Sequence, residues 1–339
     1  MATWSYRSVL SELRRGQAAA RRLLLAALIL THSAVGNATD TAAAAVSSAP
    51  ALDSSTLIMT VGERPVYWPE FRFWLKYLSS YARSSGSTAT QWRSLAADNA
   101  CNDTAIEQQS AVLGVKLTSA DLAHLAKARD DGVRIYGSRS EYQHIVASMY
   151  GSEELYQYLS KIDLLGDHLY THLYGADGAG CDDACVGSFV SAKELMNVRY
   201  IFHTNPEVLK KLLWQLRSTR AAPALFQSLM NQYSQDQSLR DFPDGRLLAR
   251  GVKGTPFDAA YSALADGTIS GIVNGNDGSY IIQRLPILPG MSVDTGGTRL
   301  RYWAAYQYLY KPQVTAWCNQ LSTTYTDTYQ QLDPARLIE

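Results

Sequence analysis

The sequence predicts an α+β fold with a compact mixed module between two helical segments, and two patterns carry this prediction. Between Val198 and Pro286, short runs rich in β-branched and aromatic residues alternate with amphipathic helical patterns, as in VRYIF, TPFDAAYSAL and GSYIIQRLP. On either side, in 140–175 and 299–332, apolar residues recur at helical spacing. A chain of 339 residues is long enough for two domains, or for one domain with an insertion.

The charge balance bears on the class of partner. Lys plus Arg and Asp plus Glu both count 31, and no run of like charge is present, so we expect no nucleic-acid partner. The chain also has 21 Tyr and 7 Trp. Side chains that combine apolar area with a polar tip suit a surface that holds unfolded polypeptide, although ordinary core packing accounts for most of them.

Residues 1–38 have the pattern of a signal peptide. Four arginines between positions 14 and 22 precede LLLAALIL, and small residues follow up to Ala38. The apolar run from Leu23 is shorter than the roughly 18 residues that a spanning helix needs. We therefore expect export and an extracytoplasmic location: periplasm, cell surface or secreted. An uncleaved anchor is the alternative, and it would be the chain's only membrane contact. Residues 39–55, rich in Ala, Ser and Thr, predict a flexible tether.

Residues 56–174 predict a mostly helical module that opens with two short strands. A helix is expected near Pro69, where apolar residues at i, i+3, i+4 and i+7 form one buried stripe. The next helix is expected from about Asp103 to Val112. Thr118 or Ser119 can cap the helix after it.

Residues 175–190, rich in Gly and Cys, predict a hinge loop between two modules. The chain has four cysteines, Cys101, Cys181, Cys185 and Cys318. In an exported protein the default for the middle pair is a disulfide, within the loop or to the other two thiols. A zinc site is a second interpretation, because His168 and His172 add H-x3-H to C-x3-C. Free thiols are the third. We adopt the disulfide and assign no metal.

Residues 191–287 form the mixed module, and single residues set its boundaries. Asn205 is a favourable N-cap and Pro206 fits the first helical position. Further helices are expected from Pro223 and Pro256, before a closing strand. After a Gly-containing linker, residues 288–339 predict a second helical segment that a proline at position 312 should interrupt or kink.

The motifs F..L...YS.D, PF..A...L..G.IS..V and G.YII.RL, in this order, resemble the parvulin-type (PpiC or rotamase) peptidyl-prolyl isomerase domain of SurA-like and PrsA-like extracytoplasmic foldases. The start of the helical module and LGVKLTSADL resemble the N-terminal part of the same proteins. The resemblance implies a SurA-like helical module, completed by the C-terminal helix packing on it, and a parvulin-like α/β domain. Cys101 and Cys318 would then be disulfide partners, and Cys181 and Cys185 would form a second bridge.

The resemblance also implies catalytic residues. Tyr200 and Tyr280 stand where parvulins carry two facing His. Asp236 stands where they carry an Asp or Cys close to the rotating carbonyl. The two phenols could hydrogen-bond to each other across the site. Each residue could instead have a purely structural role. The two tyrosines would then be strand residues that fill the protein core, and Asp236 would cap a turn.

For substrate binding the resemblance implies a pocket for the proline ring, lined by Leu247 and Phe257. Phe257 could equally be a core residue of its helix. Lys253 replaces the usual Met of this pocket, and its ammonium must turn to water or accept a desolvation penalty.

The function that follows is a peptidyl-prolyl cis-trans isomerase and foldase that needs no cofactor and acts on X-Pro bonds of exported, unfolded clients. The alternative is a parvulin-like chaperone, weak or inactive in catalysis, that binds such clients. The altered pocket is the feature that separates these two functions.

Overall fold

A computed structural model describes residues 52–219, 222–242, 244–275, 277–294 and 297–337. The predicted signal segment 1–38 and nearly all of the tether lie outside the described residues. Within the described part, no helix is both long and apolar enough to cross a membrane.

The chain divides into two compact units. The first, which we call the helical unit, runs up to His172 and resumes at Gln313. The second, the α/β unit, is the continuous stretch Leu173–Pro312. The α+β class predicted from the sequence is confirmed.

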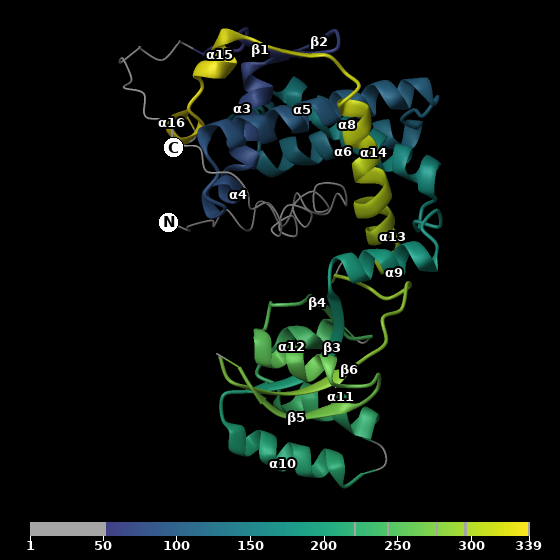
Figure 1. The fold of residues 1–339 in the computed structure, drawn as a ribbon. Coiled ribbons are helices and arrows are strands. Elements are labelled where there is room, and N and C mark those ends of the chain that lie inside the picture. Colours follow the sequence, from purple (N-terminus) through teal and green to yellow (C-terminus); the bar gives the residue numbers. More distant parts are fainter. Residues whose placement is uncertain (1–51, 220–221, 243, 276, 295–296, 338–339) are drawn as a thin grey trace. The chain divides into compact units, whose positions relative to one another are not determined.

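The helical unit combines a small sheet with a layer of helices (Figure 1). From the first part of the chain come β1 (Leu57–Val61), β2 (Arg64–Tyr67), α3 (Trp68–Tyr77), α4 (Ser79–Ser84), α5 (Ala89–Val112), α6 (Ser119–Tyr136), α7 (Arg139–Tyr150) and α8 (Glu153–Tyr174). The C-terminal segment adds α14 (Lys311–Cys318), β7 (Thr323–Tyr325), α15 (Asp327–Gln331) and α16 (Pro334–Leu337).

Both ends of the chain build the sheet of the helical unit. The strand order is β2-β1-β7, with β1 antiparallel to both neighbours, so the first strand pairs with one from the C-terminal segment. A disulfide between Cys101 of α5 and Cys318 of α14 joins the same two parts of the sequence. The predicted stripe of α3 is buried beneath the sheet, with Phe71, Trp74 and Leu75 at most 2% exposed.

Two helices of this unit differ from their predicted extent. The helix expected from Asp103 begins at Ala89, where Thr88 and Gln91 form a capping box. The added turns bury mainly alanine, which leaves little apolar periodicity to detect. The stretch 140–175 is two helices, because Gly151 adopts φ 93° between α7 and α8. Thr118 caps α6, as one of the two predicted candidates.

The core of the α/β unit is a four-stranded antiparallel sheet of order β4-β3-β6-β5. Its elements are β3 (Leu195–His203), α10 (Pro206–Arg217), α11 (Ala222–Tyr233), the short 3-10 helix η1 (Gln237–Asp241), β4 (Arg246–Ala249), α12 (Thr255–Ser262), β5 (Ile269–Asn274) and β6 (Ser279–Arg284). In Figure 1, α10 and α12 lie on opposite faces of the sheet.

The predicted start of α10 is confirmed. Asn205 accepts a hydrogen bond from the backbone N–H of Glu207 (2.9 Å), and Pro206 takes the first helical position. The apolar face of this helix, up to Leu216, is buried against the sheet. β3 and β6 are the two inner strands of this sheet, since each has a neighbour on both sides.

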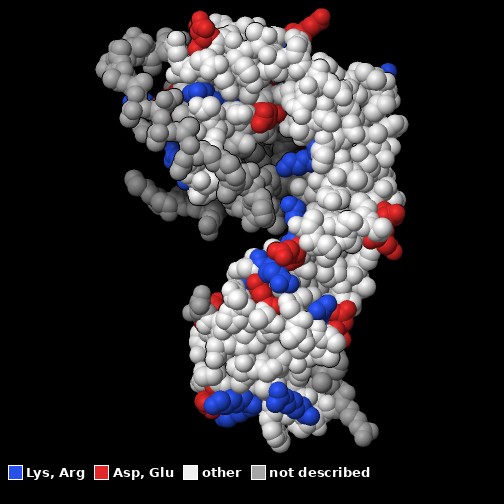
Figure 2. Space-filling model, in the orientation of Figure 1, with Lys and Arg blue, Asp and Glu red and all other residues white. Residues whose placement is uncertain are grey.

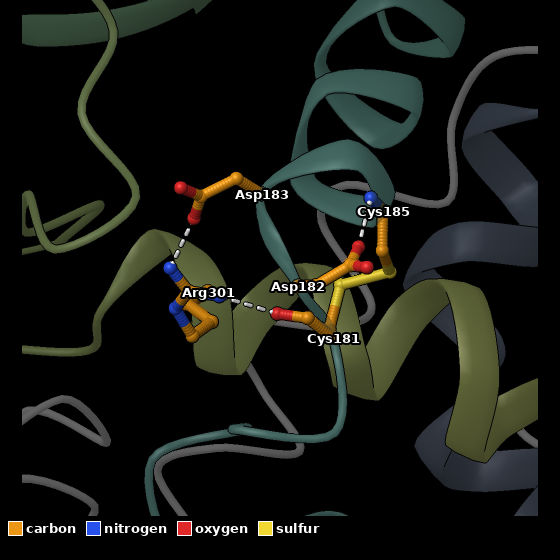
Figure 3. The surroundings of a disulfide bond; sticks show 5 residues. All are labelled: Cys181, Asp182, Asp183, Cys185 and Arg301. Atoms are coloured by element: carbon orange, nitrogen blue, oxygen red, sulfur yellow. Dashed lines mark hydrogen bonds and ion pairs between the residues drawn. A yellow bond between two sulfur atoms is a disulfide. The ribbon is translucent and has the colours of Figure 1, made fainter.

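The segment 175–190, predicted as a loop, is partly helical. Asp182 caps α9 (Asp183–Ala192) by accepting the N–H of Cys185 (2.8 Å), and Cys181 and Cys185 form a disulfide at the start of this helix (Figure 3). Asp182 is a favourable N-cap, but the glycines around it made the segment look like a loop in the sequence.

The C-terminal segment 288–339 was expected to pack as a whole on the N-terminal module, and this was wrong for its first half. Its helix α13 (Leu300–Ala305) belongs to the α/β unit. There Arg301 donates to the carbonyl of Cys181 (2.6 Å) and pairs with Asp183 of α9 (Figure 3). A π-helical turn (η2, Tyr306–Tyr310) ends two residues before Pro312, near which the interruption was predicted.

The face of the molecule drawn in Figure 2 carries acidic and basic side chains in small mixed groups. This distribution agrees with the equal counts of 31 for each sign.

Candidate functional site

Three aromatic rings meet on one face of the sheet in the α/β unit. Because β3 pairs with β6 so that Phe202 faces Tyr280, the side chains of Tyr200 and Tyr280 lie diagonally on the same face. Their ring centroids are 5.5 Å apart at 76°. Phe257 of α12 packs its ring edge-to-face on both, at 5.7 and 5.3 Å. All three residues are 0% exposed. We call Tyr200, Tyr280 and Phe257 the aromatic cluster.

The phenols of the cluster do not bond to each other, so that expectation was wrong. Tyr200 donates to Oδ2 of Asp236 and Tyr280 donates to Oδ1 of Asp277, each at 2.6 Å. A nearby carboxylate is the stronger acceptor, and it satisfies a buried hydroxyl better than a second phenol would. Burial, and then the partner carboxylate, raise the pKa of both phenols, so both stay neutral at pH 7.

Asp236 combines the two roles that the sequence left open. Its Oδ1 caps η1 by accepting the N–H (3.1 Å) and hydroxyl (2.6 Å) of Ser238, while its Oδ2 holds Tyr200. Burial alone would raise the pKa of Asp236, but the hydrogen bonds from Ser238 and Tyr200 outweigh it, so the pKa lies below its ordinary value. Arg246 supports the arrangement by donating to the Ser238 hydroxyl (2.7 Å). The carboxylate is thus ionised at neutral pH and fixes Tyr200.

Lys253 lies over the aromatic cluster in an arrangement that the sequence did not suggest. Its Nζ is 5.1 Å from the ring centroid of Tyr200 and 5.5 Å from that of Tyr280, and its side chain is half-buried. The electron-rich faces of the two rings attract the ammonium and offset part of its lost hydration. The lysine therefore neither turns fully to water nor accepts an uncompensated penalty.

Leu247 does not belong to this site, which corrects its assignment to the proline pocket. In β4, Leu247 pairs with Asn197, an odd-numbered residue of β3, so its side chain lies on the sheet face opposite Tyr200. Its neighbour Leu248 pairs with Met196 and shares the face of the aromatic cluster. The assignment taken from the family motif was shifted by one residue along β4. Because side chains alternate between the two faces of a sheet, a shift of one residue places the side chain on the other face.

Two further members of the site were not predicted from the sequence. Phe202 packs on Tyr280 at 5.0 Å, and the period of two from Tyr200 was the signal for it. Asp277, three residues before Tyr280 in a turn rich in Gly and Asn, looked like an ordinary turn residue.

Three of the four residues weighed for zinc have other partners. Cys181 and Cys185 are bonded to each other, and His168 contacts Asp121 through Nε2 at 2.9 Å. Within the described ranges, no three or more His, Cys, Asp or Glu side chains form a group that could hold a metal ion.

Comparisons with known proteins place similar structures among bacterial foldases. No protein-family model and no curated protein sequence matches the chain. The foldase protein PrsA of Streptococcus pneumoniae is 13% identical, with 78% of this chain and 94% of that chain covered and a TM-score of 0.34. The peptidylprolyl isomerase PrsA of Bacillus cereus is 15% identical, with 85% and 100% covered and a TM-score of 0.31.

A third similar structure is that of a SurA-like chaperone of Campylobacter jejuni. It is 14% identical, with 80% of this chain and 100% of that chain covered and a TM-score of 0.25. The similar solved structures are thus PrsA-like and SurA-like proteins, the group that the sequence motifs resemble. At these identities and TM-scores they carry no argument about the site, which rests on its own geometry.

Proposed function

We propose that this chain is an exported foldase that binds unfolded, proline-containing polypeptides, and that its α/β unit isomerises their X-Pro bonds with low turnover. The observation that carries the proposal is the aromatic cluster with its two hydrogen-bonded carboxylates. The sequence motifs support the proposed reaction, and the pattern of residues 1–38 supports the proposed extracytoplasmic location.

The chemistry asks little of the protein beyond binding. The barrier to rotation about an X-Pro bond is about 18–20 kcal/mol and comes from amide resonance, so no covalent bond has to break. An apolar site that seats the proline ring and removes water from the amide favours the twisted state over both planar ones. No cofactor is needed. Phe257 and the faces of Tyr200 and Tyr280 would contact the proline ring, and Asp236 and Asp277 would hold the two phenols in place.

Low turnover follows from how closed the site is. The rings of the aromatic cluster belong to fully buried residues, and Lys253 lies across two of them. A proline ring can reach these faces only after the lysine has moved. The free energy needed to move the lysine reduces the binding energy that can stabilise the twisted amide, so the rate is low.

The test is a protease-coupled isomerisation assay on a short X-Pro peptide with the chain from Thr39 onward. We expect acceleration above the uncatalysed rate that Phe257→Leu reduces at least about tenfold, since the ring that contacts proline is lost. Phe226→Leu is the matched control, because Phe226 is equally buried in the same unit but belongs to α11. Equal losses in the two variants would contradict a pocket at Phe257.

A second candidate function is client binding without turnover, and the complete burial of the aromatic cluster favours it. It predicts no acceleration on any X-Pro peptide, while the chain still suppresses aggregation of an unfolded client. Aggregation measured by light scattering, with and without the chain, separates the two candidates.

A further inference from the structure

We propose that Lys253 is a gate over the proline site and that an acidic residue next to the client proline opens it, so that Asp-Pro and Glu-Pro segments are the preferred substrates. The proposal rests on the proposed function and specifies its substrate class. It starts from the ammonium of Lys253, which lies over the faces of Tyr200 and Tyr280 at 5.1 and 5.5 Å.

The ammonium of Lys253 has no carboxylate partner within the described residues. Ion pairs in this region join other groups, such as Arg250 with Glu194 (3.9 Å) and Arg284 with Asp266 (2.7 Å). A cation held mainly by ring faces is bound more weakly than one in a hydrogen-bonded ion pair. A carboxylate that came within reach would therefore draw Lys253 away from the rings.

The acidic groups beneath the cluster do not compete for this role. Asp236 accepts from Tyr200 and Ser238, and Asp277 accepts from Tyr280. Both carboxylates are occupied at the hydroxyl ends of the rings. A phenol that donates to a carboxylate has a more electron-rich ring, which strengthens the hold of the faces on a cation. The hydrogen bonds that fix the two phenols thus also strengthen the binding of Lys253 to the ring faces.

Lys253 lies in a short loop whose backbone path is set by two glycines. Gly251 and Gly254 flank it with φ 89° and 90°, and an added Cβ at Gly251 would meet nothing within 4 Å. The N–H of Gly251 is fixed to Asp258 Oδ2 of α12 at 2.7 Å, so one end of this short loop stays anchored while the lysine swings. Once it swings out, two tyrosine faces and the edge of Phe257 form an apolar floor for a proline ring.

The resulting sequence of events links specificity to access. A client carboxylate beside the proline pairs with Nζ of Lys253, the ammonium leaves the ring faces, and the proline ring takes its place. A neutral neighbour gives no such pairing, and a basic neighbour is repelled. Selectivity of about twofold to fivefold for Glu-Pro over Gln-Pro is expected for a partly exposed ion pair.

The experiment uses the full chain and peptides of the form Ala-Xaa-Pro-Phe with Xaa Glu, Gln or Lys. Isomerisation gives kcat/KM, and fluorescence anisotropy of labelled peptides gives Kd at two salt concentrations. We expect the order Glu, Gln, Lys in both readouts, with the preference shrinking at high salt. Lys253→Met should abolish the preference while raising the rate on Gln-Pro, and Lys253→Glu should reverse it. Lys210→Met, which removes an exposed lysine paired with Glu207 on α10, should leave it intact.

Failure of the gate and failure of the proposed function give different results. If all three peptides bind or isomerise equally well, the gate is overturned and the foldase proposal stands. If Lys210→Met loses the preference as completely as Lys253→Met, general charge explains the preference and the gate is again overturned. If no peptide binds or isomerises, the proposed function fails and the gate falls with it.

Discussion

The two units of this protein differ in how their distant sequence segments are held together. The helical unit brings together segments from both ends of the chain, through the pairing of β1 with β7 and a disulfide between residues 217 positions apart. The α/β unit is continuous, and its disulfide joins residues only 4 positions apart. In the chain-entropy account, a crosslink over the long loop stabilises by about 5 kcal/mol and one over the short loop by about 2 kcal/mol. A disulfide is therefore expected to stabilise most the unit whose segments are farthest apart in the sequence.

The α/β unit closes instead through one buried amide. Asn197 in β3 is 1% exposed and donates through Nδ2 to the carbonyl oxygens of Asp244 (3.0 Å) and Pro286 (2.7 Å). These bonds tie the loop before β4 and the end of the module to its central strand. In this protein hydrogen bonds join the distant parts of the contiguous unit, whereas the discontinuous unit adds a disulfide between segments 217 positions apart.

The largest effect is expected from removing the long disulfide. The double variant Cys101→Ser/Cys318→Ser should lower the free energy of unfolding of the helical unit by up to about 5 kcal/mol. Hydrogen exchange of the backbone amides of β1 and α5, which belong to this unit, measures its stability.

The matched variant is Cys181→Ser/Cys185→Ser. It should cost about 2 kcal/mol in the α/β unit and leave the hydrogen exchange of the helical unit unchanged. Equal losses in the two double variants would break the comparison.

The second effect tests the closure around Asn197. Gly245→Ala should cost about 3 kcal/mol, because its φ is 94° and a Cβ would lie 2.2 Å from Oδ1 of Asn197. Gly267→Ala is the control: its φ is 80°, but a Cβ there meets nothing within 4 Å, so only about 1 kcal/mol should be lost. Urea unfolding followed by circular dichroism measures both, and a control as damaging as Gly245→Ala would remove the role given to Asn197.

A smaller effect is expected inside the aromatic cluster. Tyr200→Phe removes a buried hydrogen bond to Asp236 and should cost about 1–2 kcal/mol. It should also raise the pKa of Asp236, since one of the bonds that lowers it disappears. Carboxyl NMR shifts against pH measure the second effect. Tyr233→Phe, at a residue that is 40% exposed, should change neither quantity. A pKa of Asp236 unmoved by Tyr200→Phe would speak against the assigned contact.

The smallest effect concerns pH and the helical unit. Asp121 accepts from Thr118 in the α6 cap and from His168, and its pKa falls from 3.8 to about 2. Because the folded pKa is the lower one, this stabilisation is present above about pH 4 and is lost as the pH falls towards 2. Asp121→Asn should flatten the stability profile in that window by less than about 1 kcal/mol. Asp130→Asn on the same helix is the comparison, and an identical profile in both variants would rule out a special role for Asp121.

Local signals made much of the fold predictable. The N-cap at Asn205, the proline that follows it and the apolar stripe of α3 each act within one or two turns, so the sequence displays them directly. The start of α5 was missed because its buried residues are mainly alanine, and α9 because glycines surround its cap.

The site was less predictable because its partners come from distant parts of the sequence. The tyrosine pair and Phe257 stood out through the family motifs, and the structure brings them into contact. Neither the link from Tyr280 to Asp277 nor the place of Lys253 over the rings follows from spacing, because both depend on side-chain directions after the sheet has formed. Leu247 failed for a related reason: a shift of one residue along a strand exchanges its faces.

The pairing of β1 with β7 also sets an order of events during synthesis. A polypeptide is made from its N-terminus, so all of the α/β unit is synthesised before Thr323–Tyr325. The α/β unit can then fold while the helical unit still lacks one edge of its sheet and one half of its long disulfide. Until that last strand arrives, β1 presents an open edge to other chains, and the nascent protein is itself a substrate for assistance in folding.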